Sequence, residues 1–144
     1  MFGDDSQWML VFRVGGERFA LPLASVNEVI EMPPVQTLPD SSDRVLGVAT
    51  LRGELVSMYD PRPLLQAGAV DTHEMALLFT MENRRVGLAI DDVFDPIVIE
   101  PDDVRPAPGV EATDSVLLGV VRRGTELVGV LDADALLRAL REER

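Results

Sequence analysis

Apolar residues along this chain fall into short runs separated by turn residues, a pattern typical of β-strands joined in hairpins. The first two runs, residues 9–14 and 18–23, flank Gly15 and Gly16, which suit a tight turn. The same arrangement recurs three times, at residues 45–51 with 55–59, 75–81 with 85–90, and 117–121 with 127–131. Short strands at this spacing favour small barrels over a sheet with crossover helices.

Helical structure is predicted in only a small part of the chain. Residues 25–30 and 91–95 are expected to be short turns or helices. After Asp132, a suitable N-cap, four apolar residues share one helical face: Ala133, Leu136, Leu137 and Leu140. Arginines follow towards the end, where they oppose the negative end of the helix dipole. The sequence therefore predicts one amphipathic helix at about residues 132–144, with its apolar face packed on the core.

The chain also contains an internal duplication. When residues 45–65 are aligned with residues 117–137, nine of the 21 pairs are identical. The pairs are Leu46/Leu118, Gly47/Gly119, Val48/Val120, Glu54/Glu126, Leu55/Leu127, Val56/Val128, Asp60/Asp132, Leu64/Leu136 and Leu65/Leu137. Upstream, Phe12/Phe79 and Leu21/Leu88 pair at a shift of about 67 residues. Because the Gly, Glu and Asp matches are not ordinary strand residues, we interpret the pattern as a repeat.

This repeat predicts a single domain spanning residues 1–144 that contains two similar β units. The first unit is expected at about residues 8–66 and the second at about 74–131. Each unit contains a glycine at a hairpin turn that requires positive φ, Gly53 in the first and Gly124 in the second. The glycine of the second turn lies one place earlier, so the two units have diverged there.

Composition and charge exclude several classes of partner. The net charge of −12 would repel a phosphate backbone, so nucleic acid is not an expected partner. No apolar run approaches the roughly 18 residues of a membrane span, and the first residues lack the order of a secretory signal. The expected location is therefore the cytoplasm, without membrane insertion. The absence of cysteine removes disulfides, thiolate nucleophiles and most zinc sites.

The sequence offers little catalytic chemistry. His73 is the only histidine, and there is no lysine, so neither a triad nor a phosphate-binding lysine can be assembled. Two carboxylate pairs, Asp91 with Asp92 and Asp102 with Asp103, would suit acid and base roles, although aspartates in turns are usually turn formers. We therefore expect no catalytic residues, cofactor or metal. A small-ligand-binding barrel or an enzyme that uses these carboxylates is the alternative of another class.

Residues 47–56, which run Gly-Val-Ala-Thr-Leu-Arg-Gly-Glu-Leu-Val and precede Asp60, resemble the central signature of the CheW family of bacterial chemotaxis coupling proteins. Residues 12–29 resemble the opening of that domain, and residues 88–93 and 118–132 resemble its second half. The resemblance implies a mainly β fold of two SH3-like, five-stranded barrels packed together, with short helices and a C-terminal helix. It also implies a non-catalytic scaffold that links a chemoreceptor to a histidine kinase in a chemosensory complex.

The resemblance further implies the partners and the contact residues. The cytoplasmic tip of a chemoreceptor would dock in the groove between the barrels, and the chain would form rings with the regulatory domain of the kinase. The positions that match receptor contacts are Val26, Glu28, Gly47 and Arg52. From the residues alone, Arg52 would be a solvated turn charge, Gly47 a bulge or a close backbone approach, and Val26 a core residue.

Three residues depart from the family pattern. Thr50 stands where Asn is usual, Ser57 where Pro is common, and Pro61 where Leu is usual. An alternative function is therefore a diverged relative that retains only the receptor or only the kinase interface and serves a non-flagellar motility pathway. Because the two units have diverged at one turn, we expect them to face different partners.

Overall fold

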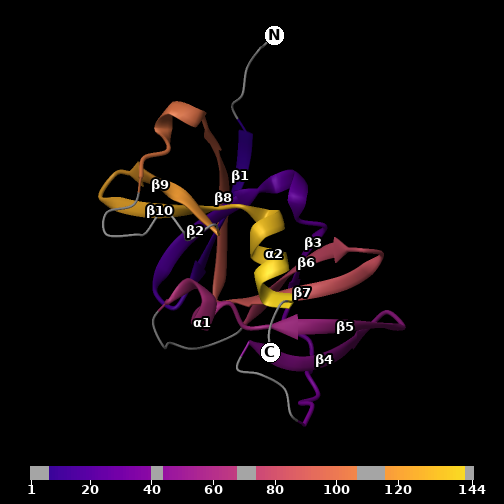
Figure 1. Cartoon of the computed structure of the whole chain (residues 1–144). Coiled ribbons are helices and arrows are strands. Elements are labelled where there is room, and N and C mark those ends of the chain that lie inside the picture. Colours follow the sequence, from indigo (N-terminus) through magenta and orange to yellow (C-terminus); the bar gives the residue numbers. More distant parts are fainter. Residues whose placement is uncertain (1–6, 40–43, 68–73, 107–115, 142–144) are drawn as a thin grey trace.

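The structure is a computed structural model that describes residues 7–39, 44–67, 74–106 and 116–141. Ten strands form two five-stranded sheets (Figure 1). The first sheet contains, in spatial order, β8 (Asp92–Ile99), β1 (Gln7–Val14), β2 (Glu17–Pro22), β10 (Glu126–Leu131) and β9 (Leu117–Arg123). The second contains β3 (Glu28–Glu31), β6 (Met75–Met81), β7 (Arg84–Ile90), β5 (Glu54–Tyr59) and β4 (Val45–Leu51).

A short backbone bridge closes each sheet into a barrel. In the first sheet, Arg105 exchanges two backbone hydrogen bonds with Val120 of β9, at 2.9 and 2.8 Å. In the second sheet, Gln36 exchanges two with Val48 of β4, both at 2.9 Å. We call the closed first sheet barrel A and the closed second sheet barrel B. The mainly β fold with two five-stranded units, expected from the sequence, is confirmed.

The two barrels do not follow the two halves of the sequence, and the subdomain boundaries at about 8–66 and 74–131 are therefore wrong. Barrel A combines the hairpin β1–β2 of the first repeat with β8, β9 and β10 of the second. Barrel B combines the hairpin β6–β7 of the second repeat with β3, β4 and β5 of the first. Parallel pairing joins the repeats, because β10 pairs with β2 and β5 pairs with β7. Each barrel thus contains a hairpin from one repeat and three strands from the other, so the two repeats exchange strands.

The expectation of turns or helices at residues 25–30 and 91–95 is also wrong. Half of the first segment, residues 28–30, belongs to strand β3, after a single 3-10 turn, η1 (Leu23–Ser25), and most of the second begins strand β8. Asp95 and Pro96 have the composition of a turn, but they form a bulge, since the partners of β8 on β1 skip from Val11 to Met9. A bulge accommodates Pro96 because no ladder donor is required there.

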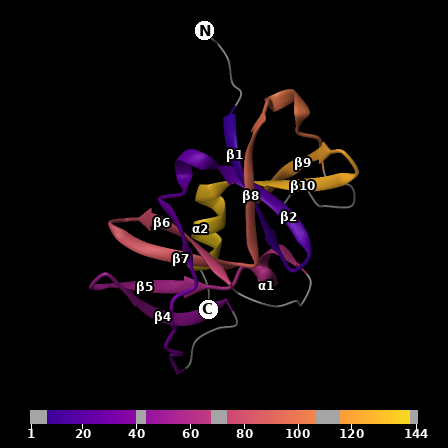
Figure 2. The same ribbon diagram turned by 180° about the vertical axis from the view of Figure 1, so that it is seen from behind.

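Three apolar cores hold the barrels together. One fills barrel A and another fills barrel B. The third lies between the barrels and joins alternate residues of β1, β2, β6 and β7 to helix α2 (Ala133–Arg141). In β1, for example, Met9 and Val11 face the interior of barrel A, whereas Leu10 and Phe12 face this shared core. Burial on both faces explains why the β1 and β6 segments are almost continuously apolar. Helix α2 lies between the two barrels, as Figures 1 and 2 show from opposite sides.

Two equivalent aspartates begin the two helices. Asp132 accepts a hydrogen bond at 3.1 Å from the backbone N–H of Ala135, so the predicted N-cap of α2 is confirmed. Asp60, which is buried, accepts one at 3.0 Å from the N–H of Arg62 at the start of α1 (Arg62–Leu65). Pro61 lies between Asp60 and Arg62 at the helix start, where a missing N–H is tolerated. A second 3-10 turn, η2 (Pro101–Asp103), follows β8.

Candidate functional site

Two of the sequence-predicted contact residues, Arg52 and Glu28, meet at the exposed edge of barrel B. They are 24 residues apart in sequence, yet Arg52 Nη2 lies 2.5 Å from Glu28 Oε2. Arg52 is at the tip of the β4–β5 hairpin, and Glu28 begins β3. The arginine side chain is 59% exposed and the glutamate side chain 36% exposed. Both charges are therefore accessible to a partner.

This pair continues into a longer series of charges along the barrel. Arg85 of β7 lies 3.9 Å from the second oxygen of Glu28 and 3.9 Å from a carboxylate oxygen of Glu54. We call Arg52, Glu28, Arg85 and Glu54 the ion-pair chain. The series comes from three parts of the sequence, and neither Arg85 nor Glu54 was expected at the site. Glu54 was detectable as one of the identical residues of the repeat, but Arg85 carried no signal of its own.

The backbone of the β4–β5 turn explains why Arg52 projects from the barrel. Arg52 has φ of 51° and Gly53 has φ of 85°. Two successive positive φ values define the tight hairpin turn that matches strand twist. The requirement for positive φ at Gly53 and Gly124, expected from the sequence, is confirmed. The corresponding turn of barrel A consists of Gly124 and Thr125, so a glycine occupies the position of Arg52.

The other two candidates have structural roles. Gly47 approaches the backbone of Gln36 at the bridge that closes barrel B, and a Cβ atom there would collide with the Gln36 carbonyl. Val26 is half-buried and packs against the shared core, close in the chain to Glu28. The four candidates thus divide into an exposed charged pair and two residues that shape the barrel beneath it.

An exposed apolar cluster lies at the start of strand β1 and was not expected from the sequence. Trp8, Leu23 and Val98 are 59%, 39% and 41% exposed. Trp8 pairs with Val98 across β1 and β8, and Leu23 directly follows Pro22, which pairs with Met9 at the same end of β1. Trp8 is on the face of β1 that carries Leu10 and Phe12 into the shared core. The alternation of Trp8, Leu10 and Phe12 in the sequence was the available signal that Trp8 shares their face of the strand.

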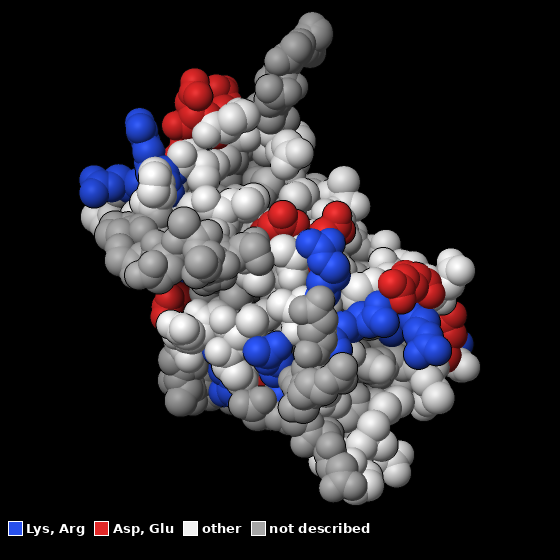
Figure 3. Space-filling view, viewed as in Figure 1, with Lys and Arg blue, Asp and Glu red and all other residues white. Residues whose placement is uncertain are grey.

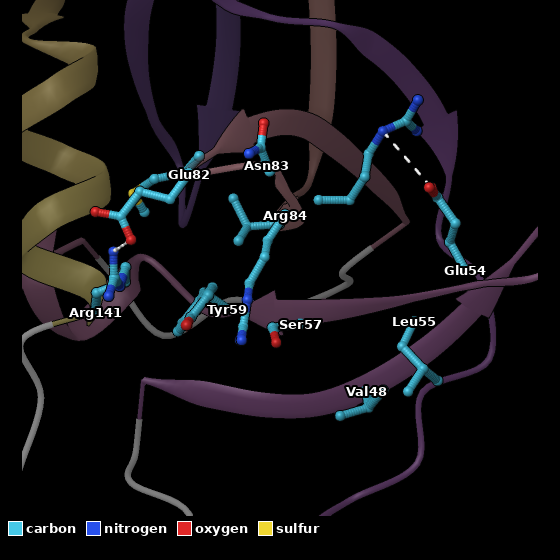
Figure 4. Close-up of a pocket in the computed structure, with 12 residues that line it drawn as sticks. Val48, Glu54, Leu55, Ser57, Tyr59, Glu82, Asn83, Arg84 and Arg141 are labelled. Atoms are coloured by element: carbon cyan, nitrogen blue, oxygen red, sulfur yellow. Dashed lines mark hydrogen bonds and ion pairs between the residues drawn. The ribbon is translucent and has the colours of Figure 1, made fainter.

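A cavity of about 810 Å³ lies on the outer face of barrel B beside the end of α2 (Figure 4). Its floor is formed by β4 and β5, including Leu55, Ser57 and Tyr59, and the tip of the β6–β7 hairpin forms a wall. Arg84 extends across this floor towards Tyr59 and Ser57 (Figure 4). Arg141 of α2 pairs with Glu82 of the hairpin tip at 2.6 Å. The cavity is therefore polar and belongs to one barrel rather than to the groove between the two.

The carboxylates of the enzyme alternative do not converge. Buried Asp91 accepts a hydrogen bond at 2.8 Å from the backbone N–H of Gly15 and lies 3.8 Å from Arg13. Asp92 accepts from the N–H of Val93, and Asp103 from the N–H of Glu100. The Asp91 contact joins the end of β7 to the distant β1–β2 turn, and the contacts of Asp92 and Asp103 are local. His73 lies outside the described residues.

No group of three or more His, Cys, Asp or Glu residues within the described ranges could hold a metal ion. Among the helices of those ranges, none is long and apolar enough to cross a membrane.

The charge of the visible face is uneven (Figure 3). Basic and acidic side chains alternate over barrel B, and at the upper left, over the β9–β10 hairpin, projecting basic side chains lie next to acidic ones. With exposed ion pairs, an exposed apolar cluster and two barrels around a shared core, the fold and the site define a protein-binding β-barrel scaffold.

Comparisons with known proteins agree with this class. The model of the CheW-like domain matches residues 9–141, and the chain belongs to the CheW-like domain family. The chain is 27% identical to the chemotaxis protein CheW of Klebsiella aerogenes over 135 residues, which cover 91% of this chain and 81% of the relative. It is 29% identical to protein FrzA of Myxococcus xanthus over 141 residues, 94% of this chain and 88% of the relative.

The fold also matches a solved structure. The scaffolding protein TtCheW of Thermoanaerobacter tengcongensis superposes with a TM-score of 0.74 at 19% identity, over 88% of each chain. At this level of identity the likeness establishes the fold, and it agrees with the resemblance to the coupling-protein family noted in the sequence.

Proposed function

We propose that this chain is a cytoplasmic coupling scaffold that links a chemoreceptor-like protein to a histidine kinase and performs no reaction itself. The observation that carries this proposal is the pairing of Arg52 with Glu28 on the exposed edge of barrel B, next to half-buried Val26. Membership of the CheW-like domain family and the similarity to chemotaxis proteins support it.

The site suits the recognition of a helical receptor tip. A helix that docks on a protein surface needs apolar contact along one side and a few charges that fix its register. Half-buried Val26 and Val29, which flank Glu28 in the chain and pack against the shared core, supply apolar surface, and the Arg52–Glu28 pair supplies the charges. Holding a receptor and a kinase on one small scaffold would raise their effective concentration for each other.

The proposal is tested by separate pull-downs against a chemoreceptor cytoplasmic fragment and a kinase regulatory domain from the same organism. Arg52→Glu is expected to weaken receptor binding at least about tenfold, because a reversed charge at the contact repels the partner that the arginine attracts. Arg138→Glu is the matched control, since Arg138 is an exposed arginine on α2 and is distant in sequence from the candidate residues. Equal effects of the two variants would contradict the proposal.

The two pull-downs also distinguish the alternatives. A diverged scaffold that has kept one interface would bind one of the two partners and not the other. Ser57 and Pro61 depart from the family pattern. Ser57 lines the cavity on barrel B and Pro61 precedes α1, so neither belongs to the ion-pair chain. This arrangement favours retention of the receptor contact. An enzyme that uses Asp91 or Asp103 receives no support, because both carboxylates are engaged in turn hydrogen bonds.

A further inference from the structure

Barrel A has a cleft of about 110 Å³ at the end that carries the β9–β10 hairpin tip. Its walls include Val11 and Val128, which belong to the buried interior core of the barrel, together with half-buried Phe94 and Ile97. Its remaining lining residues are charged: Arg18, Asp95, Arg123 and Glu126. The cleft therefore leads from a charged rim to the apolar interior of the barrel.

The repeat makes this cleft the counterpart of the ion-pair chain of barrel B. Arg18 corresponds to Arg85, and Glu126 corresponds to Glu54, at the shifts that relate the two repeats. The ion pair itself is repeated, because Arg18 lies 3.1 Å from Glu126 and Arg85 lies 3.9 Å from Glu54. The same end of each barrel therefore presents the same pair of charges.

One substitution between the repeats changes the chemistry of this end. Phe94 pairs with Val11 of β1, and Glu28 pairs with Leu78 of β6. Because Val11 and Leu78 are equivalent positions of the two repeats, Phe94 occupies in barrel A the place that Glu28 occupies in barrel B. The guanidinium carbon of Arg18 lies 4.1 Å from the centroid of the Phe94 ring. In barrel B the equivalent arginine, Arg85, instead approaches the Glu28 carboxylate. An ion pair in one barrel is thus a cation–π contact in the other, and an apolar ring replaces a charge.

A second substitution leaves the cleft open. Gly124 occupies the position of Arg52, so no side chain reaches from the hairpin tip as Arg52 reaches to Glu28. Arg123, the preceding residue, is exposed and forms no ion pair with any residue in the described ranges. The end of barrel A therefore places an exposed cation beside an apolar opening.

We propose that the end of barrel A is a second docking site, which accepts one branched apolar side chain of a partner's peptide segment next to a carboxylate. The apolar side chain would enter the cleft between Phe94, Ile97 and Val128. A cavity of this volume is smaller than one that accepts benzene and suits a single aliphatic group. Arg123 would bind the adjacent carboxylate, since its charge has no partner within the described residues. The proposal goes beyond the receptor-linking function and does not depend on it.

The test uses 4-methylpentanoate, which combines a leucine-like tail with a carboxylate, as a small probe of the full-length protein. NMR of labelled methyl groups should show saturable shifts at Val11 and Val128 at millimolar probe concentration. The neutral analogue 4-methylpentanamide should bind about two- to fivefold more weakly, as expected for loss of one exposed ion pair. Arg123→Gln should reduce the affinity for the acid to that for the amide.

Two variants test the apolar part of the site. Phe94→Glu, which gives barrel A the residue found at the same place in barrel B, should abolish the shifts, and Ile97→Gln should do the same if the first variant does not fold. Arg138→Gln removes an equal charge elsewhere and should leave them unchanged. The proposal is overturned if Val11 and Val128 show no saturable shift, if acid and amide bind equally, or if a folded Phe94→Glu or Ile97→Gln protein binds as the parent does. None of these outcomes changes the expected receptor pull-down.

Discussion

Gly47 lies so close to Gln36 that a Cβ atom at position 47 would overlap the backbone carbonyl of Gln36. Gly119 repeats this relationship in barrel A, where a Cβ atom would stand 2.5 Å from the carbonyl oxygen of Arg105. Both contacts occur at the bridges that close the barrels. The identical glycines of the two repeats therefore share a physical cause, which is closure of a barrel without room for a side chain.

Gly47→Ala is accordingly expected to lower the free energy of unfolding by at least about 2 kcal/mol, because the bridge to Gln36 must open or shift. Chemical denaturation measures this loss. The matched control is Gly53→Ala, where a Cβ would meet open space and only the positive φ is strained, so the loss should be about 1 kcal/mol. A Gly47→Ala protein of unchanged stability that fails to bind a receptor would instead make Gly47 a contact residue.

The Arg52–Glu28 pair permits a charge-exchange experiment. Each single reversal, Arg52→Glu or Glu28→Arg, should change the unfolding free energy by less than about 1 kcal/mol, since exposed ion pairs contribute little. The double variant restores an ion pair with reversed polarity and should recover stability. It should not recover receptor binding, because the partner meets the wrong charge. Recovery of binding in the double variant would show that the pair acts only within this chain.

Asp91→Asn tests whether the buried carboxylate is structural. The substitution weakens a charge-assisted hydrogen bond to the Gly15 N–H and removes the attraction to Arg13, so a loss of about 1–3 kcal/mol is expected in denaturation experiments. Asp102→Asn is the control, since Asp102 is an exposed residue of η2, and its effect should stay within about 0.5 kcal/mol. A small effect of Asp91→Asn would reopen a functional role for that carboxylate.

The sequence indicated the hairpins, the duplication and the final helix because each has a local signal, such as Gly15 and Gly16 at a turn or Asp132 before an apolar stripe. It did not indicate the exchange of strands between the repeats. Internal similarity identifies equivalent segments, but it does not show whether a strand pairs with its own copy or with the other one. That choice depends on parallel contacts between distant segments, such as Met58 with Gly87.

The candidate site was predicted only in part for the same reason. The resemblance selected Arg52 and Glu28, and the structure joins them. It offered no signal for Arg85, which reaches both Glu28 and Glu54 only because β7 lies beside β5. Phe94 was hidden by the bulge at Asp95 and Pro96, which shifts the alignment of β8 by one residue.

Helix α2 supplies a prediction about cooperativity. Leu136 and Leu140 are almost fully buried in the core that the two barrels share. Leu136→Ala should therefore cost about 2–5 kcal/mol, as core truncations of leucine do. Because the strands are exchanged between repeats and α2 contacts the shared core, neither barrel can retain its structure alone. Thermal unfolding followed by near-ultraviolet and far-ultraviolet circular dichroism should show one coincident transition, shifted to lower temperature in the variant. Two separate transitions in the parent or the variant would mean that the barrels unfold independently and that the shared core does not couple them.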